Sequence, residues 1–418
     1  MKKQIDLEKQ IDIEKQDLEK TNRSGKAKGG KEMTLSKYSF ALPTRVEFGE
    51  GIIGTVGDEV KALGAKKVML VTDKGVRGAG LTKPVEEILT KEKLPFIVFD
   101  QVVPNPRDVD CHAGYELAKK EDVDVLVAVG GGSSMDTAKA IGTLLTNGGI
   151  VQDWCGFQLL KKEITPLIAI PTTAGTGSEV TPFAVITDTK EHVKLNIFDP
   201  KAAAKVALVD PATLLNLPSH IMASTGIDAM THAVEAYTCK VATPHTDAYA
   251  LYAIDLIQTH LRNAVKSPDI TSCTGMMLAS TIAGIAFGYS DVGAVHCMAE
   301  ALGGKYDTPH GIANAVLLPT VTEFNMSSDY EKHANIAKAL GVNISGMKIE
   351  EAAKHAVSEL SKLSDDVGIP KIKDIDGINP DDFPALAEAA EKNVSTPSNP
   401  REVTAKDYLE LFQKAYNA

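Results

Sequence analysis

Four residues in the second half of the chain have the side chains and the spacing of a metal site. Asp228 and His232 lie four positions apart in residues 226–237, so on a helix their side chains would share one face. His296 and His310 follow further along the chain. One carboxylate and three imidazoles suit zinc or ferrous iron, although the i, i+4 pair taken alone is more often a solvated surface pair.

A glycine-rich turn in the first half has the composition of a phosphate site. Residues 123–129 are a short apolar run, and the three glycines at 130–132 come between this run and a helical pattern. Glycines let the backbone approach a phosphate, and a helix N-terminus favours an anion. The turn is not G-x-G-x-x-G, because Met135 holds the last position. Ser133 and Asp136 would also suit a capping box, and both interpretations can hold together.

Two further segments place polar side chains directly after apolar runs. Asp73 ends the run at 68–72, where a carboxylate can accept hydrogen bonds from an adenosine ribose and so select NAD over NADP. A plain strand-to-helix turn would use the same residue. Residues 171–181 follow the run at 167–170 and are rich in threonine, serine and glycine, which favours a loop that faces a ligand.

The elements that must position these residues change character near the middle of the chain. Short apolar runs alternate with helical patterns in the first half, which predicts βαβ units and a parallel sheet. The runs are residues 68–72, 96–99, 123–129, 167–170 and 206–210. After Pro218 the pattern is helical almost throughout, at 220–240, 246–265, 274–286, 293–303, 329–340, 349–367 and 405–416. We expect an α/β, Rossmann-like nucleotide-binding domain at 37–214, followed by an all-helical metal-binding domain at 215–418.

The first 36 residues differ from the rest. A repeat of the type Gln-Ile-Asp-Leu-Glu-Lys begins at Gln4 and Gln10, and a shortened copy begins at Gln16. Its apolar stripe is too thin to predict a helix with a buried face, and residues 21–31 are typical of a flexible linker. We expect residues 1–36 to be an appendage: a disordered tail, an added tag or a short docking segment.

The composition is that of a soluble globular protein with an acidic surface. Of the 418 residues 44% are apolar and 24% are charged, and the net charge of −11 argues against nucleic acid or an anionic membrane as the main partner. The five cysteines form no C-x-x-C pair, which favours a reducing compartment without a thiolate zinc site. We find no signal peptide and no apolar run long enough to span a bilayer, so we expect a cytoplasmic protein.

Taken together, the motifs resemble those of the iron-containing, or group III, alcohol dehydrogenases. The resemblance covers Tyr38 to Ala418 and rests on residues 130–133, 172–179, 226–237 and 309–319. It is closest to members that act on small primary alcohols such as 1,3-propanediol and methanol. It implies a dehydroquinate synthase-like fold, NAD(H) and Fe(II) or Zn(II) as cofactors, and a homo-oligomer built from dimers.

The resemblance also assigns residues. The family's metal ligands match Asp228, His232, His296 and His310. Its cofactor contacts match Asp73, Asn105, Gly131, Gly132, Ser133, Asp136, Thr172, Thr173, Thr176, Lys194 and Leu215. Phe287 and Ser395 match positions that line the substrate pocket.

One position departs from the family. Four residues after His296, where the family commonly has a second histidine, this chain has Glu300. We count Glu300 and Phe287 as candidate catalytic residues. Glu300 could relay protons, recognise a polar or cationic group of the substrate, or orient a ligand histidine, and we favour the last of these roles.

The predicted reaction is reversible hydride transfer between a small primary alcohol and NAD(H), assisted by the metal. A metal-dependent lyase resembling dehydroquinate synthase and a transhydrogenase are alternatives on the same fold. The lyase substrate is phosphorylated and carboxylated, yet the only basic residues between 226 and 310 are Lys240, Arg262, Lys266 and Lys305. A third possibility is an aldehyde-detoxifying enzyme that is docked in a microcompartment through residues 1–36.

Overall fold

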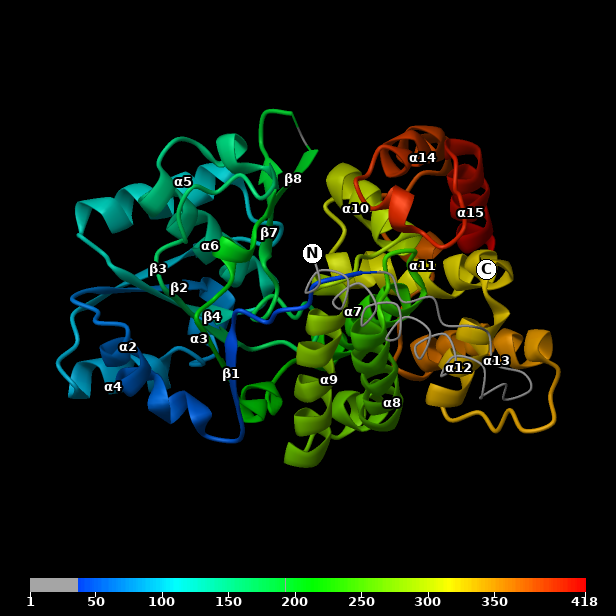
Figure 1. Ribbon diagram of the computed structural model, residues 1–418, viewed down its shortest axis with the longest axis horizontal. Coiled ribbons are helices and arrows are strands. Elements are labelled where there is room, and N and C mark those ends of the chain that lie inside the picture. The colour runs from blue at the N-terminus through cyan, green and yellow to red at the C-terminus, as the bar shows by residue number, and fades with distance from the viewer. Residues whose placement is uncertain (1–36, 192) are drawn as a thin grey trace, which may run out of the picture. The chain divides into compact units, whose positions relative to one another are not determined.

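Six parallel strands form the main sheet, in the order β1-β9-β6-β4-β2-β3 (Figure 1). Their bounds are β1 Arg45–Phe48, β2 Val68–Asp73, β3 Phe96–Val102, β4 Val125–Gly130, β6 Leu167–Pro171 and β9 Val206–Val209. The computed structural model describes residues 37–191 and 193–418, of which 40–418 form one unit. All five predicted strands belong to this sheet, and β1 is an addition to the prediction.

Helices cover both faces of the sheet. The described helices of this part are α2 Val56–Ala62, α3 Lys74–Gly78, α4 Lys83–Lys91, α5 Asp108–Lys120 and α6 Gly132–Asn147. Successive side chains of a strand point to opposite faces. In β2, Val68 and Leu70 therefore pack with α2 and α4, whereas Met69 and Val71 pack with α5 and α6. Burial on both faces explains why these strands are uninterrupted apolar runs.

A second, smaller sheet has the strand order β5-β8-β7. Its strands are β5 Gly156–Phe157, β7 Phe183–Asp188 and β8 Val193–Phe198. β7 and β8 pair antiparallel, and β5 pairs parallel with β8. The sequence does not predict this sheet, because two of its strands mix polar and apolar residues on a half-buried surface.

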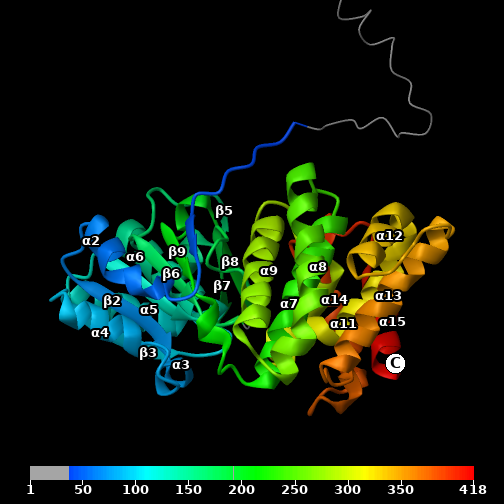
Figure 2. The same ribbon diagram turned by 90° about the horizontal axis from the view of Figure 1, so that it is seen from below.

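The remainder of the unit is helical, as predicted. The described helices are α7 Ser219–Thr238, α8 Pro244–Lys266, α9 Ile270–Gly288, α10 Ala294–Tyr306, α11 His310–Asn325, α12 Tyr330–Ala339, α13 Ile349–Asp366, α14 Phe383–Glu391 and α15 Ala405–Asn417. Figure 2 shows α7, α8 and α9 side by side, with α9 next to the sheet. A parallel-sheet part followed by a helical part confirms the predicted fold class.

The division at residue 214 stays a prediction. β9 ends at Val209 and α7 begins at Ser219, but Ala207 and Val209 pack in the same apolar core as the helices. The repeat and the linker predicted within residues 1–36 lie outside the described residues.

α9 contradicts the prediction that no apolar run is long enough to span a bilayer. Among the described residues it is the one helix long and apolar enough to cross a membrane, with a mean hydropathy of 1.5. The prediction that no such run exists is therefore wrong. However, 78% of the apolar window is buried inside the fold, as expected for the central helix of a helical core.

Candidate active site

The structure brings the four predicted metal ligands together. Asp228 and His232 share one face of α7, His296 comes from α10 and His310 is the first residue of α11. One ligand atom from each residue lies within 4.8 Å of the other three. Asp228, His232 and His296 are buried, whereas the side chain of His310 is 39% exposed. The cluster is therefore open to solvent on the His310 side.

Neighbouring groups fix the orientation of three of these side chains. His232 Nδ1 lies 3.2 Å from the carbonyl oxygen of Gly175, and His296 Nδ1 lies 2.5 Å from Glu235 Oε2. Asn314 donates from Nδ2 to Asp228 Oδ1 at 2.7 Å. Ligand histidines of metal sites commonly bond to a carboxylate or carbonyl through the ring nitrogen that does not bind the metal.

A buried ring nitrogen of one candidate ligand lacks a partner. His296 Nε2 is buried and has no hydrogen-bond partner among the residues that the structure describes. A buried polar atom without a partner is costly, and a cation held by the other three ligands would satisfy it. Three imidazoles and one carboxylate are a donor set that both Fe(II) and Zn(II) accept. The residues present therefore fit a divalent metal ion.

The pKa values of His232 and His310 agree with this fit. Burial lowers the pKa of His232 to about 3 and also lowers the pKa of His310, so both rings are neutral at pH 7 and can bind a metal. Burial acts to raise the pKa of Asp228, but the neighbouring histidines and the hydrogen bond from Asn314 together outweigh it and the pKa is lowered. Burial acts to lower the pKa of His296, but the hydrogen bond that its Nδ1 donates to Glu235 prevails and the pKa is raised.

An aromatic ring covers one side of the cluster. Phe287 of α9 stacks on His232 with a centroid distance of 4.0 Å and an interplanar angle of 9°. The ring is only 8% exposed, so it keeps water from this side of the imidazole. Phe287 therefore touches the metal cluster, as its predicted place in the substrate pocket requires.

The glycine turn lies against the threonine-rich loop. α6 begins at Gly132, and Gly131 is its N-cap. A Cβ at Gly131 would lie 3.2 Å from Thr173 Oγ1, and one at Gly132 would lie 2.9 Å from Thr176 Cγ2. Side chains at either position would therefore press on the threonines. A capping box with Ser133 as the N-cap is wrong, because the helix begins before Ser133 and no side chain caps it.

The other predicted cofactor residues of the main sheet lie at the same edge. Asp73 ends β2 and accepts a hydrogen bond from Val76 N at 2.9 Å, so it caps α3. Thr172 follows β6, and its backbone N–H donates to the carbonyl oxygen of Gly130 at 3.0 Å. The carboxyl ends of parallel strands are where α/β folds bind nucleotides.

Asp136 lies one turn into α6, after the glycine turn. Its carboxylate accepts hydrogen bonds from Ser178 Oγ at 2.8 Å and from Val185 N at 3.1 Å. Burial raises the pKa of Asp136. The carboxylate therefore joins α6 to the threonine-rich loop and to β7.

Asn105 and Lys194 form a chain of contacts that reaches the helical part. Lys194 Nζ donates to Asn105 Oδ1 at 2.9 Å, and Asn105 Nδ2 donates to Asp307 Oδ1 at 2.7 Å. Asn105 and Asp307 both have left-handed backbones, with φ of 52° and 54°. Leu215 lies apart from these residues and packs, half-buried, against the helical core.

Glu300 lies on α10 one turn after His296 and is half-buried. Asn393 donates from Nδ2 to Glu300 Oε2 at 2.6 Å, and the backbone N–H of Ser395 donates to Asn393 Oδ1 at 3.0 Å. Ser395 Oγ donates to Asp291 Oδ1 at 2.9 Å. The predicted pocket residue Ser395 thus belongs to the network that holds Glu300.

Sequence reasoning missed two side chains that support the cluster. Glu235 lies seven residues after Asp228 on α7, a spacing that returns to the same helix face. Asn314 lies four residues after His310 on α11, and this spacing likewise places its side chain on the same helix face as the ligand. The carbonyl of Gly175 gives no signal, because nothing in the sequence brings that loop to His232.

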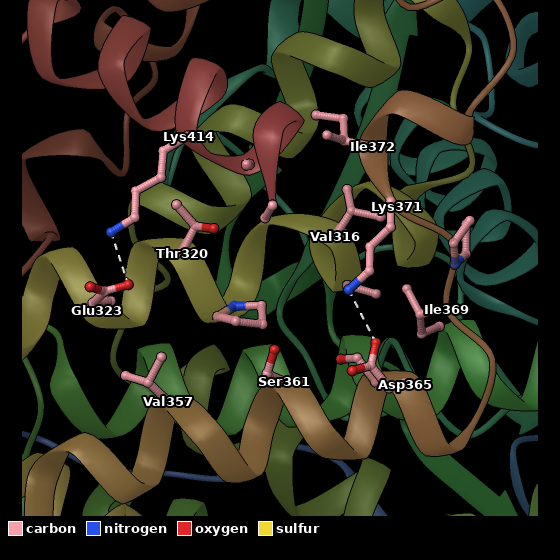
Figure 3. A pocket seen from close by; sticks show the side chains of 16 residues that line it. Val316, Thr320, Glu323, Val357, Ser361, Asp365, Ile369, Lys371, Ile372 and Lys414 are labelled. Carbon is pink, nitrogen blue, oxygen red and sulfur yellow. Dashed lines mark hydrogen bonds and ion pairs between the residues drawn. The ribbon is translucent and has the colours of Figure 1, made fainter.

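A pocket of about 180 Å³ lies elsewhere in the helical part, between α11, α13 and α15 (Figure 3). Ion pairs of 2.8 Å between Lys414 and Glu323 and of 3.1 Å between Lys371 and Asp365 flank it. Its lining includes no histidine, no cysteine and none of the predicted site residues. The chemistry therefore belongs to the histidine cluster.

Known proteins resemble this chain in both its sheet part and its helical part. The family model "Iron-containing alcohol dehydrogenase" matches residues 43–211, and "Fe-containing alcohol dehydrogenase family, C-terminal" matches residues 222–416. The 1,3-propanediol dehydrogenase of Citrobacter freundii is 42% identical, over 92% of this chain and 100% of that protein. The NAD-dependent methanol dehydrogenase of Bacillus methanolicus is 40% identical, over 90% and 99%. The choline dehydrogenase of Bacillus subtilis (strain 168) is 42% identical, over 91% and 95%.

Solved structures agree with the sequence comparison. The crystal structure of a 1,3-propanediol oxidoreductase superposes with a TM-score of 0.89 at 40% identity, and the match covers 91% of this chain and 100% of that one. The two family models together span both the sheet part and the helical part. The chain therefore belongs to the iron-containing alcohol dehydrogenase family of oxidoreductases.

Proposed function

We propose that this protein interconverts a small primary alcohol and its aldehyde, with NAD(H) and with Fe(II) or Zn(II). The observation that carries the proposal is the group of four ligand atoms within 4.8 Å of one another, which includes the unpartnered His296 Nε2. When bound, the metal supplies Lewis acidity toward the alcohol oxygen and the nicotinamide accepts or donates the hydride.

The helical part contributes the metal side. Asp228, His232, His296 and His310 hold the ion. Glu235 fixes the ring of His296, and Phe287 covers His232 and excludes water from that side. His310 is the most exposed of the four, so the substrate oxygen approaches from its side.

The sheet part contributes the cofactor side. The N-terminus of α6 and the turn before it bind the pyrophosphate through backbone N–H groups, and the glycines at 131 and 132 let this turn lie close to Thr173 and Thr176. Asp73 at the end of β2 accepts hydrogen bonds from the ribose and disfavours a 2′-phosphate. Thr172, Thr173 and Thr176 line the adjacent loop. Asn105, in the loop before α5, and Lys194, in β8 of the small sheet, complete the group of cofactor residues.

Two of the four basic residues between positions 226 and 310 are paired with carboxylates, which supports a substrate without phosphate groups. Arg262 pairs with Asp366 at 2.7 Å and Lys305 pairs with Asp382 at 3.2 Å, so both are engaged outside the cluster. The lyase resembling dehydroquinate synthase would need such cations for its substrate. The relatives are named for 1,3-propanediol, methanol and choline, which are small alcohols without phosphate groups.

The test is an NADH-oxidation assay on anaerobically purified protein, reconstituted with ferrous iron or with zinc, over a panel of short aldehydes. We expect aldehyde-dependent turnover with at least one metal, and loss of bound metal and of turnover together in a His310→Ala variant. Full turnover in a metal-free His310→Ala protein would contradict the metal scheme. If the protein binds metal and NAD(H) but turns over no aldehyde, the lyase or the transhydrogenase becomes the favoured function.

A cytoplasmic homo-oligomer completes the proposal. The five cysteines are free in the structure, which supports a reducing compartment. Sedimentation equilibrium of the metal-loaded protein would give the mass, and we expect a dimer or a multiple of dimers. A purely monomeric protein would contradict this part of the proposal.

A further inference from the structure

The first turn of α10 is held by side chains from other parts of the chain. Its N-cap is Gly293, which has no side chain to accept the free backbone N–H groups of this turn. Asn399 Oδ1 accepts a hydrogen bond from Ala294 N at 3.1 Å, and Glu235 Oε1 accepts one from Val295 N at 2.7 Å. Two residues that are distant in the sequence therefore take the place of the usual N-cap side chain.

The same turn carries a metal ligand. His296 follows Val295 directly, and its Nδ1 donates to Glu235 Oε2 at 2.5 Å. Nε2 of this ring is buried and has no hydrogen-bond partner within the described part of the chain. Because a helical backbone has a fixed rise and rotation per residue, the placement of residues 294 and 295 decides where the ring of His296 lies.

Asn399 is buried, and every polar group of its side chain is bonded. It exchanges two hydrogen bonds with Asn325, the last residue of α11. Asn325 Nδ2 donates to Asn399 Oδ1 at 2.9 Å, and Asn399 Nδ2 donates to Asn325 Oδ1 at 2.8 Å. Asn399 Nδ2 also donates to the carbonyl oxygen of Arg401 at 2.7 Å. These partners fix the amide with Oδ1 toward the start of α10.

Gly293 lets the two acceptors lie close to the helix start. A Cβ at this position would lie 2.9 Å from Asn399 Oδ1 and 3.1 Å from Glu235 Oε1. Even a methyl group at position 293 would therefore press on both oxygens.

Residues 393–399, here called the 393–399 segment, contact all three helices that carry the metal ligands. Directly after α7, Lys240 N donates to the carbonyl oxygen of Ser398 at 2.9 Å. On α10, Glu300 Oε2 accepts a hydrogen bond from Asn393 at 2.6 Å. The amide pair described above reaches α11. The segment thus joins α7, α10 and α11 at residues other than the metal ligands.

The contact with Ala294 is the one nearest in sequence to a ligand. Ala294 lies two residues before His296, whereas Asn325 lies on the order of 20 Å along α11 from His310. A shift at Ala294 therefore moves a ligand directly, and a shift at Asn325 does not.

We propose that Asn399 is a positioning residue of the metal site: it fixes the first turn of α10, so that the ring of His296 keeps its place among the four ligands. This inference rests on the metal site of the proposed function.

The test begins with Asn399→Ala in the full chain. We expect the Kd for Zn(II), measured by competition with a chelator, to rise by about tenfold or more, as for other groups that orient a metal ligand. The visible absorption spectrum of the Co(II)-loaded protein should also change, because Co(II) accepts the same nitrogen and oxygen donors and its bands report their arrangement. The Kd for NADH should stay that of the wild type, since the predicted cofactor contacts do not include Asn399.

Asn325→Ala is the matched control. It removes an amide from the same buried pair and leaves the bond between Ala294 and Asn399 in place. We expect both variants to unfold at lower urea concentration, because each leaves a buried polar group without its partner. Only Asn399→Ala should change the Kd for Zn(II) and the Co(II) spectrum. If Asn399→Ala loses stability but keeps both metal readouts of the wild type, its role is only structural and the inference is overturned. An equal rise of the Zn(II) Kd in the two variants also overturns it.

Gly293→Ala reaches the same contact without removing a polar group, and it replaces Asn399→Ala if that variant does not fold. The added methyl group presses on Asn399 Oδ1, so we expect weaker Zn(II) binding in this variant too. Wild-type affinity in Gly293→Ala would overturn the inference. A wild-type protein that binds neither Zn(II) nor Co(II) would refute the proposed function and this inference with it, whereas wild-type binding that Asn399→Ala does not weaken refutes the inference alone.

Discussion

At the scale of single residues, we expect the loss of the Glu235 charge to lower the affinity for the metal. Its two oxygens bond to His296 Nδ1 at 2.5 Å and to the backbone N–H of Val295 at 2.7 Å. Glu235→Gln keeps the shape but removes the charge that orients and polarises the imidazole. We expect metal affinity to fall by about 10- to 100-fold, measured by competition with a chelator. Affinity equal to that of the wild type would show that Glu235 is only structural.

The same residues show what the sequence can reveal about a site. Asp228, His232, His296 and His310 are identifiable because their side-chain types suit a metal, and the structure brings all four together. Glu235 and Asn314 carry a spacing signal, but a lone carboxylate or amide on a helix has many ordinary uses. The contact of Gly175 with His232 depends on a loop far away in the sequence, and no local pattern encodes it.

At the scale of elements, Lys139 joins α6 to the loop between β6 and β7. The side chain is fully buried, and Nζ donates to the carbonyl oxygens of Ser178, Thr181 and Phe183 at 2.7, 3.1 and 2.7 Å. The threonine-rich loop of the cofactor side is therefore tied to the helix that begins at the glycine turn. Lys139→Met would leave these acceptors unpaired beside Asp136.

We expect Lys139→Met to lower the free energy of unfolding by about 3 kcal/mol or more, because one partner of a buried charged network is removed. Urea unfolding measures the loss. Lys120→Met is the control, since Lys120 is exposed at the end of α5. A loss no larger than that of the control would contradict the role given to Lys139.

The pH dependence of this difference is a separate prediction. Burial lowers the pKa of Lys139 to about 8, whereas an unfolded lysine titrates near ~10.4. Between these values the unfolded state binds more protons, so the lysine's contribution to stability rises with pH. It is lowest and constant below pH 8. The wild type should therefore gain up to roughly 1.4 kcal/mol per pH unit relative to Lys139→Met in this window, and a flat difference would contradict the burial of the ammonium.

The elements themselves were only partly predictable. Strands buried on both faces are apolar runs, so five strands of the main sheet are visible in the sequence. β7 and β8 are half-buried and mix residue types, and nothing local distinguishes them from a loop. α11 contains Pro319, which removes a backbone donor and normally ends a helix, and residues 310–325 are not among the helices that the sequence predicts.

At the scale of the whole described unit, a hydrogen bond between Asn105 and Asp307 is among those that join the sheet part to the helical part. Asn105 Nδ2 donates to Asp307 Oδ1 at 2.7 Å, and both residues have left-handed backbones. Asp307→Gly removes the side chain without backbone strain, and Asp307→Asn keeps an acceptor as its control. We expect the glycine variant to raise KM for NAD by roughly tenfold at unchanged metal content. An unchanged KM would show that the contact does not position Asn105.

A deletion variant can test whether residues 1–36 are needed for catalysis by the rest of the chain. The two family models match residues 43–211 and 222–416, and the alignments with the curated relatives cover 90–92% of this chain and 95–100% of the relatives. All residues assigned to metal, cofactor and substrate lie within 40–418, which form one unit. Deletion of residues 1–36 should therefore leave metal content and kcat/KM within about twofold of the full chain. Kinetics and sedimentation velocity of the two proteins, side by side, decide between its possible roles. Equal kinetics with altered sedimentation would support docking, whereas a large loss of activity would mean that the segment stabilises the catalytic unit.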